Sequence, residues 1–283
     1  MKKLAIRDSI LEVLGFLWTN RPDLFRMIAA PVLALSVINT AVAALLPKPE
    51  TPTTELQTAA TISTALLIGV SFIFYVMFAV AWHRRCLKPE EQTTIWTALR
   101  WDKRKTQFMT RSLVIAIILI TVAVSVGVIV TIVGGGIGLV STVGTGATGK
   151  AVPTLLGAIG TLIIVVFVFL MNSRLALWLP AAAVDDNLTL METWVLARGN
   201  TWRIFAVVLL ASAPGILFFF VVDMAVKAAS QSLGMGDTLT FRLIASLALN
   251  LANYIVIAIG VSALSTVYRE LRHPTSPGMP YYT

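Results

Sequence analysis

The sequence predicts an all-α membrane protein, a polytopic helical bundle of about six transmembrane helices with short interfacial amphipathic helices on one side. Apolar residues make up 57% of the 283 residues, charged residues only 13%, and the mean hydropathy is +0.84. A soluble domain carries about 25% charged residues, so this chain has too few charges to cover a water-facing surface. The polar residues also gather between long apolar blocks, which is the pattern of helices in lipid.

Six apolar blocks have the length of a transmembrane helix, because a hydrocarbon core of about 30 Å requires roughly 20 apolar residues in helical form. We expect spans at about 25–46, 59–82, 112–133, 155–179, 204–226 and 241–267. The connections between them, including a glycine-rich loop expected at 134–154, are too short for a second folded unit. We therefore expect residues 1–283 to form a single membrane domain.

The basic residues predict the side of the membrane that each connection faces. Of the 22 lysines and arginines, 18 fall in the N-terminal segment, the second and fourth connections and the C-terminal segment, which lie on one side if there are six spans. The positive-inside rule places that side in the cytoplasm. We expect a multi-pass protein of the bacterial inner membrane with both termini cytoplasmic. The same rule accounts for the net charge of +8 without a nucleic-acid partner.

The tryptophans fall on the same side as the basic residues. All seven are Trp18, Trp82, Trp96, Trp101, Trp178, Trp194 and Trp202. Aromatic belts ordinarily occur at both membrane interfaces, so this distribution predicts an unusually developed cytoplasmic interface.

Short amphipathic segments precede three of the spans. Residues 3–20 carry apolar side chains at helical spacing, which predicts an interfacial helix in the headgroup plane before the first span. Shorter stripes at 95–99 and 190–197 precede the third and fifth spans. An interfacial helix followed by a hairpin, used three times, predicts a threefold repeat. The alternative is that any membrane hairpin ends in aromatic and basic anchors.

The motifs that resemble catalytic or metal-binding sites lack residues that those sites require. Residues 144–151 match P-loop spacing, but Ala151 stands where the motif needs Ser or Thr for magnesium, and the segment is expected outside the cytoplasm. His83 and Cys86 supply at most two zinc ligands and the only other histidine is His273, whereas zinc takes about four. We therefore expect no catalytic, cofactor or metal site and no enzymatic activity.

The connection between the second and third spans is the most basic part of the sequence. Lysine and arginine clusters on the cytoplasmic face attract anionic lipids by about 1 kcal/mol per residue. We expect contacts with lipid headgroups or with a partner protein from His83, Arg84, Arg85, Lys88, Arg100, Lys103, Arg104 and Lys105. The acidic pair Asp185-Asp186 follows a helix end and is expected to cap a turn.

Polar residues inside the spans are candidates for function because their burial in lipid is costly. Arg174, beside Asn172, lies about a turn and a half from the cytoplasmic end of the fourth span. Its guanidinium either reaches the headgroups or lines a cavity.

The last two spans contain two further polar pairs. Asp223 and Arg242 are expected to form a salt bridge that closes the last hairpin. Asn250 and Asn253 are three residues apart, so they share a helical face and are expected to point into the protein and hold helices together. Few other polar residues lie at mid-membrane, which argues against a proton- or sodium-coupled transporter.

One segment resembles a known family. Residues 194–205, WVLARGNTWRIF, preceded by LPAAAVD at 179–185, resemble uncharacterised bacterial six-span inner-membrane proteins of the YciC kind and the membrane domain of some glycerophosphodiester phosphodiesterases. In those phosphodiesterases the chemistry resides in a separate soluble barrel domain with histidine and acidic metal ligands. This chain has two histidines and no room for a barrel, so the resemblance implies the membrane fold and not the hydrolase activity.

The leading functional hypothesis is a non-enzymatic inner-membrane protein whose basic, tryptophan-rich cytoplasmic face binds anionic phospholipid or a partner protein, which includes a second copy of the chain. One alternative is a transporter or permease subunit with a cavity near Arg174, Asn250 and Asn253. Another is an accessory subunit of a larger membrane complex.

Overall fold

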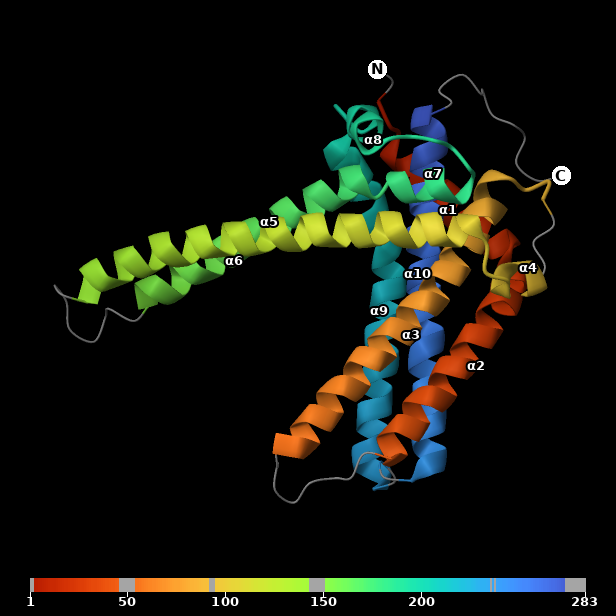
Figure 1. Ribbon diagram of the computed structural model, residues 1–283, viewed down its shortest axis with the longest axis horizontal. Helices are drawn as coiled ribbons and strands as arrows, with labels where there is room; N and C mark the ends of the chain where they lie inside the picture. The colour runs from red at the N-terminus through yellow and green to blue at the C-terminus, as the bar shows by residue number, and fades with distance from the viewer. Residues whose placement is uncertain are drawn as a thin grey trace.

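The computed structural model describes residues 3–45, 54–91, 95–142, 151–234, 236 and 238–272, with side chains described except at 55–56, 95, 129–142, 151–159 and 233. All regular secondary structure in these ranges is helical (Figure 1). The helices are α1 (Ile6–Thr19), α2 (Arg21–Leu45), α3 (Thr54–Leu87), α4 (Ile95–Leu99), α5 (Lys103–Thr142), α6 (Ala151–Leu175), α7 (Trp178–Ala183), α8 (Leu190–Leu196), α9 (Thr201–Leu233) and α10 (Leu239–Arg272).

The expected all-α class and the six apolar spans are confirmed. Among the described residues, six helical stretches are long and apolar enough to cross a membrane, namely α2, α3, α5, α6 with α7, α9 and α10. Their mean hydropathy lies between 2.0 and 2.6. The protein is therefore an integral membrane protein.

The hairpin of the third and fourth spans differs from its expected boundaries. α5 begins at Lys103 and stays helical to Thr142, so it continues well into the segment expected to be a loop at 134–154. α6 begins at Ala151, the last residue of the P-loop-like motif, and the motif's residues 144–150 lie outside the described residues. The expected loop at 134–154 is therefore too long. Its glycines do not end α5, because the surrounding sequence is apolar and continues the helix.

The fourth span is also not one continuous helix up to 179. α6 ends at Leu175 and α7 begins at Trp178. Pro180 explains the break, because its ring would clash with the carbonyl of Ala176 in an unbroken helix. Within the first turn of a new helix the same proline needs no hydrogen-bond partner and is tolerated.

Four long helices form the packed part of the membrane domain, with α10 at its centre. α10 packs against α9, α2 and α3 (Figure 1). A close approach of α9 to α10 occurs at Gly215, where an added Cβ would lie 2.5 Å from the Ile259 Cδ1 atom. Small residues allow such approaches in membranes, where helix association depends on close packing and polar contacts.

Aromatic and polar contacts join α3 to α10. The Phe78 ring meets the Tyr254 ring edge-on at 5.5 Å and stacks on the Trp82 ring at 6.0 Å. Trp82 Nε1 donates to Ser262 Oγ at 2.8 Å. All four side chains are buried, so one cluster supplies both apolar packing and a satisfied indole N–H.

The α5–α6 hairpin projects away from the four-helix group (Figure 1). Near its root α5 packs against α3 and α7, and α6 packs against α8 and α9. Only 11% of the apolar stretch of α5 is buried, compared with 28–33% for the other five spans. The sequence analysis did not anticipate this divergence, because α5 is as apolar as the helices that pack together.

The short helices lie at one end of the four-helix group, which we call the basic end. α1 precedes α2, α4 connects α3 to α5, and α7 and α8 connect α6 to α9. The order of one or two short helices followed by two long ones therefore occurs three times. α1 packs against α9 and α10 and buries Val13 completely. Protein contacts therefore hold α1 in place, in addition to any contact with the membrane surface.

Replacing Gly215 with leucine should destabilise the protein by about 1–3 kcal/mol, because the side chain would overpack the contact between α9 and α10. Thermal unfolding in mild detergent measures the effect. Gly69→Leu in α3 is the matched control, since nothing lies within 4 Å of its added Cβ. Equal melting temperatures for the two variants would contradict the close packing at Gly215.

Candidate functional site at the basic end

Two adjacent carboxylates organise the basic end. Asp185 follows α7 with a φ of 63°, and the Asp186 N–H donates to the Ala181 carbonyl oxygen at 2.9 Å. This is a Schellman-type helix end, and aspartate is one of the residues that tolerate the left-handed conformation. The expected capping role is therefore confirmed. The two side chains do more than cap, as their contacts show.

Asp185 binds two arginines from different helices. Arg104 Nε, from α5, lies 2.8 Å from both carboxylate oxygens, and Arg84 Nη1, from α3, donates to Oδ2 at 3.3 Å. Arg84 also donates to the Ala183 carbonyl oxygen at 2.9 Å and pairs with Glu91. The connection after α7 is thereby tied to both α3 and α5.

The arginines lower the pKa of Asp185. Partial burial by itself acts to raise the pKa of this carboxyl, but the hydrogen bonds and charges of Arg104 and Arg84 outweigh it and hold the pKa below its ordinary value of 3.8. The pKa of Glu91 is lowered in the same way, with Arg84 and Lys88 outweighing desolvation. Both groups are ionised at neutral pH.

Asp186 ties the same connection to α10. Its carboxylate accepts hydrogen bonds from Arg272 Nε at 3.1 Å and from the Tyr268 hydroxyl. The acidic pair thus contacts α3, α5 and α10. This role was not expected from the sequence. Two adjacent carboxylates in a protein with a highly basic connection were the signal that could have predicted it.

Two of the eight residues expected to contact lipid are buried. His83 is 1% exposed, and its Nδ1 lies 2.7 Å from Ser265 Oγ of α10. Lys105 is 2% exposed, and its Nζ donates to the carbonyl oxygens of Thr97 and Arg100. Neither side chain reaches a headgroup in this structure, which corrects the expectation for both. Apolar and basic neighbours in the sequence did not distinguish a buried cation from a surface one.

The other six divide into paired and unpaired cations. Arg84 and Arg104 bind Asp185, Arg85 Nε donates to Asp23 Oδ2 at 3.0 Å, and Lys88 lies 3.6 Å from Glu91. Arg100 and Lys103 are exposed and form no ion pair with a described residue. The basic connection is thus mainly an internal ion-pair network, with these two cations left on the surface.

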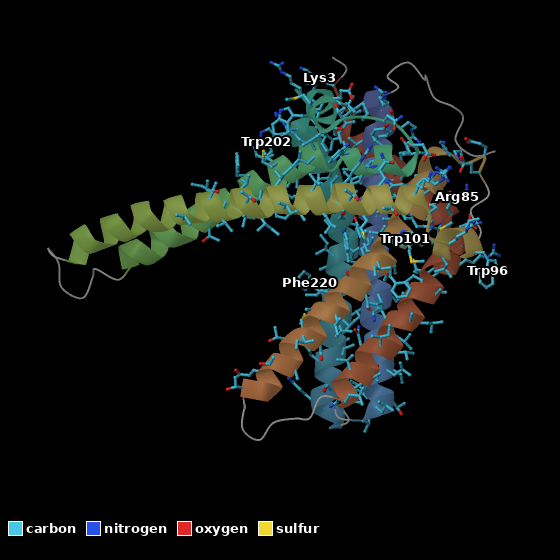
Figure 2. All side chains as sticks on the ribbon, viewed as in Figure 1. Lys3, Arg85, Trp96, Trp101, Trp202 and Phe220 are labelled. Carbon is cyan, nitrogen blue, oxygen red and sulfur yellow. The ribbon has the colours of Figure 1, made fainter. Side chains whose placement is uncertain are left out.

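Four exposed tryptophans accompany unpaired cations, and together they are called the tryptophan belt. Its members are Trp18 with Arg21, Trp96 with Arg100, Trp101 with Lys103, and Trp202 with Arg198. The Arg21 guanidinium lies 4.6 Å from the Trp18 ring centroid. Figure 2 shows Trp96 and Trp202 projecting on opposite sides of the molecule, so the belt is not a single patch.

The polar pairs of the last two spans behave differently from expectation. Asp223 pairs with Lys227 at 2.6 Å, and Arg242 donates to the carbonyl oxygens of Gly236 and Ala43, so the expected Asp223–Arg242 bridge is wrong. An i,i+4 partner within one helix needs no alignment between helices.

The two asparagines of α10 also differ from each other. Asn250 Nδ2 donates to Ser36 Oγ of α2 at 3.0 Å, which confirms its role between helices. Asn253 is exposed, which corrects the expectation that it points into the protein. Three residues turn a helix by about 300°, so the two side chains point in directions about 60° apart. A neighbouring helix can therefore cover one of them and leave the other exposed.

Arg174 lines a pocket of about 580 Å³ between α6, α8 and α9. Its Nε donates to Thr201 Oγ1 at 2.7 Å, and its guanidinium lies 4.5 Å from the Trp194 ring centroid. Asn172 is two residues away on a different side of α6, is half-exposed, and does not line the pocket. Asn250 lines a different pocket of about 300 Å³, together with residues of α2 and α10. The expected cavity shared by Arg174 and the asparagines is therefore two separate pockets.

The local sequence explains how Trp194 is placed beside Arg174. Thr189 and Glu192 form a capping box that starts α8, with the Glu192 N–H donating to Thr189 Oγ1 at 3.2 Å and the Thr189 N–H donating to Glu192 Oε2 at 2.8 Å. Gly199, with a φ of 78°, makes the turn into α9, a conformation that glycine adopts without strain.

No three histidine, cysteine, aspartate or glutamate side chains converge on a point that could hold a metal ion within the described part of the chain. The contacts described at the basic end are ion pairs, hydrogen bonds and cation–π contacts.

Asp185→Asn should lower the stability at pH 7 by about 1 kcal/mol or less, since the lost pair is partly solvent-screened. Because the folded-state pKa is depressed, the carboxylate stabilises the fold above its unfolded-state pKa and loses that effect as the pH falls through the folded-state value. The difference in stability between wild type and variant should therefore persist from pH 8 to 5, begin to fall below about pH 4, and disappear only below the folded-state pKa of Asp185.

Thermal unfolding in detergent across this range is the measurement. Asp223→Asn, which loses only a pair within α9, is the control. A wild-type-to-Asp185→Asn difference that disappears already between pH 7 and 5 would be incompatible with the depressed pKa.

Comparison of the chain with protein families, curated proteins and solved structures finds no match.

Proposed function

We propose that this is a non-enzymatic, multi-pass protein of the bacterial inner membrane, whose basic end faces the cytoplasm and binds anionic phospholipid headgroups. The observation that carries this proposal is the tryptophan belt. Each of its four exposed indoles lies within four residues of an exposed cation that forms no ion pair with a described residue.

The pairing of indole and cation suits the headgroup layer. An indole is amphipathic and resides at the level of the headgroups, where its ring meets acyl chains and its N–H meets water. A lysine or arginine beside it lies at the depth of the phosphates, and the anionic leaflet attracts each such cation by about 1 kcal/mol. The proposal therefore assigns lipid contact to Arg100 and Lys103 rather than to all eight basic residues of the connection.

The other two functional hypotheses gain unequal support. A transporter with one cavity at Arg174 and the asparagines loses its main support, because Arg174 and Asn250 line separate pockets and Asn253 lines neither of them. A subunit of a larger assembly, or a pairing of two copies, is the second candidate. It is favoured by the α5–α6 hairpin, which has few protein contacts beyond its root.

Replacing Arg100 and Lys103 with alanine should reduce the ratio of anionic to zwitterionic lipid that co-purifies in mild detergent by roughly thirtyfold, because two cations at about 1 kcal/mol each contribute about 2 kcal/mol. Mass spectrometry of the bound lipids measures the ratio. The charge-preserving exchange Arg100→Lys with Lys103→Arg is the matched control and should retain the wild-type ratio. An unchanged ratio in the alanine variant, with an unchanged melting temperature, would refute lipid binding by the belt.

The proposed orientation is checked with single cysteines in a Cys86→Ser background. Lys103→Cys lies at the basic end and Thr54→Cys lies at the opposite end of the four-helix group. A membrane-impermeant maleimide added to intact spheroplasts should label the Thr54→Cys protein only. Both should be labelled after lysis, which is the control for accessibility. Labelling of Lys103→Cys before lysis would reverse the topology.

A further inference from the structure

The pocket at Arg174 concentrates positive charge at the basic end. Arg174 and Arg203 both line it, and none of its lining residues carries a carboxylate. Its volume of about 580 Å³ falls within the range of about 300–1,000 Å³ that is typical of small-ligand sites. The charge and the size together favour an anionic ligand.

The guanidinium of Arg174 keeps most of its donors for such a ligand. Arginine carries five N–H donors, and here the Nε–H is used on Thr201 Oγ1. Its two Nη groups have no acceptor among the described residues. The ring of Trp194 backs the guanidinium plane at 4.5 Å and, with the Thr201 contact, fixes its orientation. A planar fork held in this way is suited to two oxygens of one phosphate.

Arg203 supplies a second cation at the same pocket. Its Nη1 donates to the Leu4 carbonyl oxygen at 2.6 Å, which anchors the side chain against the N-terminal segment. The side chain is half-exposed, so its remaining donors face the pocket or solvent. Arg203 thus comes from α9 and Arg174 from α6, and a ligand between them would contact both helices.

The rest of the pocket is apolar and follows one face of α6. Phe167, Leu170, Met171 and Arg174 occur at positions i, i+3, i+4 and i+7, which lie on the same side of a helix. Phe167 and Arg174 are seven residues apart, which corresponds to about 10 Å along the helix axis. Moving away from the arginine, the pocket therefore follows apolar side chains along α6.

We propose that this pocket holds one anionic phospholipid, with its phosphate on Arg174 and Arg203 and the upper part of an acyl chain along Phe167, Leu170 and Met171. The inference rests on the proposed function for the class of ligand, but it concerns a single site that shares only Trp202 with the tryptophan belt. Phe167 and Trp202 line the pocket and are largely exposed, so a lipid can enter from the bilayer and leave the rest of its chains outside.

The test is native mass spectrometry of the purified protein titrated with dioleoyl phosphatidylglycerol. Wild type should retain one lipid at concentrations where further lipids dissociate. Arg174→Gln should weaken this retention at least tenfold. Arg7→Gln, which removes an exposed cation of α1 that belongs to neither the pocket nor the tryptophan belt, is the matched control and should bind as wild type does.

A second variant distinguishes loss of the pocket from misfolding of Arg174→Gln. Met171→Trp keeps both arginines and fills the apolar part of the pocket, so it should also displace the single lipid. Dioleoyl phosphatidylcholine tests whether the headgroup charge is needed. Glycerol phosphate, which has no acyl chains, tests whether the acyl chain is needed. Neither should compete with phosphatidylglycerol at equal concentration.

Retention of the single lipid by both pocket variants overturns the inference, and so does equal binding of phosphatidylcholine. Full competition by glycerol phosphate would show a site for a free phosphate compound and would equally overturn it. The variant Arg100→Ala with Lys103→Ala should keep the single lipid. If it loses only the bulk anionic enrichment while Arg174→Gln retains the single lipid, the proposed function stands and the pocket site does not.

Discussion

The carboxylates of Asp185 and Asp186 are the interaction on which the basic end depends. Arg84 and Arg104 lie within hydrogen-bonding distance of one of them, and Arg272 and Tyr268 bind the other. Without these anions, cations from three helices would face one another across short distances and repel. The depressed pKa of Asp185 reflects the same attraction. The connection after α7 therefore holds α3, α5 and α10 in one arrangement.

This internal use of charge determines what the surface offers. Most of the basic connection is occupied by protein partners, so the exposed cations beside the belt tryptophans and the arginines of the α6–α8–α9 pocket are the ones available to a ligand. The two differ in character. The belt is spread over several helices and suits many exchanging headgroups, whereas the pocket has a held guanidinium and an apolar wall and suits one molecule.

Within the membrane, polar contacts distinguish the helices that pack from those that diverge. Trp82 of α3 donates to Ser262 of α10, and His83 of α3 is hydrogen-bonded to Ser265. Asn250 of α10 donates to Ser36 of α2, so α10 is bonded to both α2 and α3. Ser125 of α5 instead bonds back to the Thr121 carbonyl of its own helix. Lipid tails are as apolar as leucine, so a helix without such contacts gains little by packing on its neighbours. The projecting α5–α6 hairpin is consistent with this.

The sequence by itself determined the class of the protein and the number of spans, because hydropathy, length and the avoidance of charge in lipid are properties of local sequence. It also located the short helices that precede the first, third and fifth spans. Only the tertiary structure decided which cations stay on the surface. It also decided that Asn253 is exposed while Asn250 is hydrogen-bonded, and that Asp223 pairs with Lys227. Each of these depends on which side chain from another helix comes within about 3 Å, and that distance is set by packing between segments far apart in the chain.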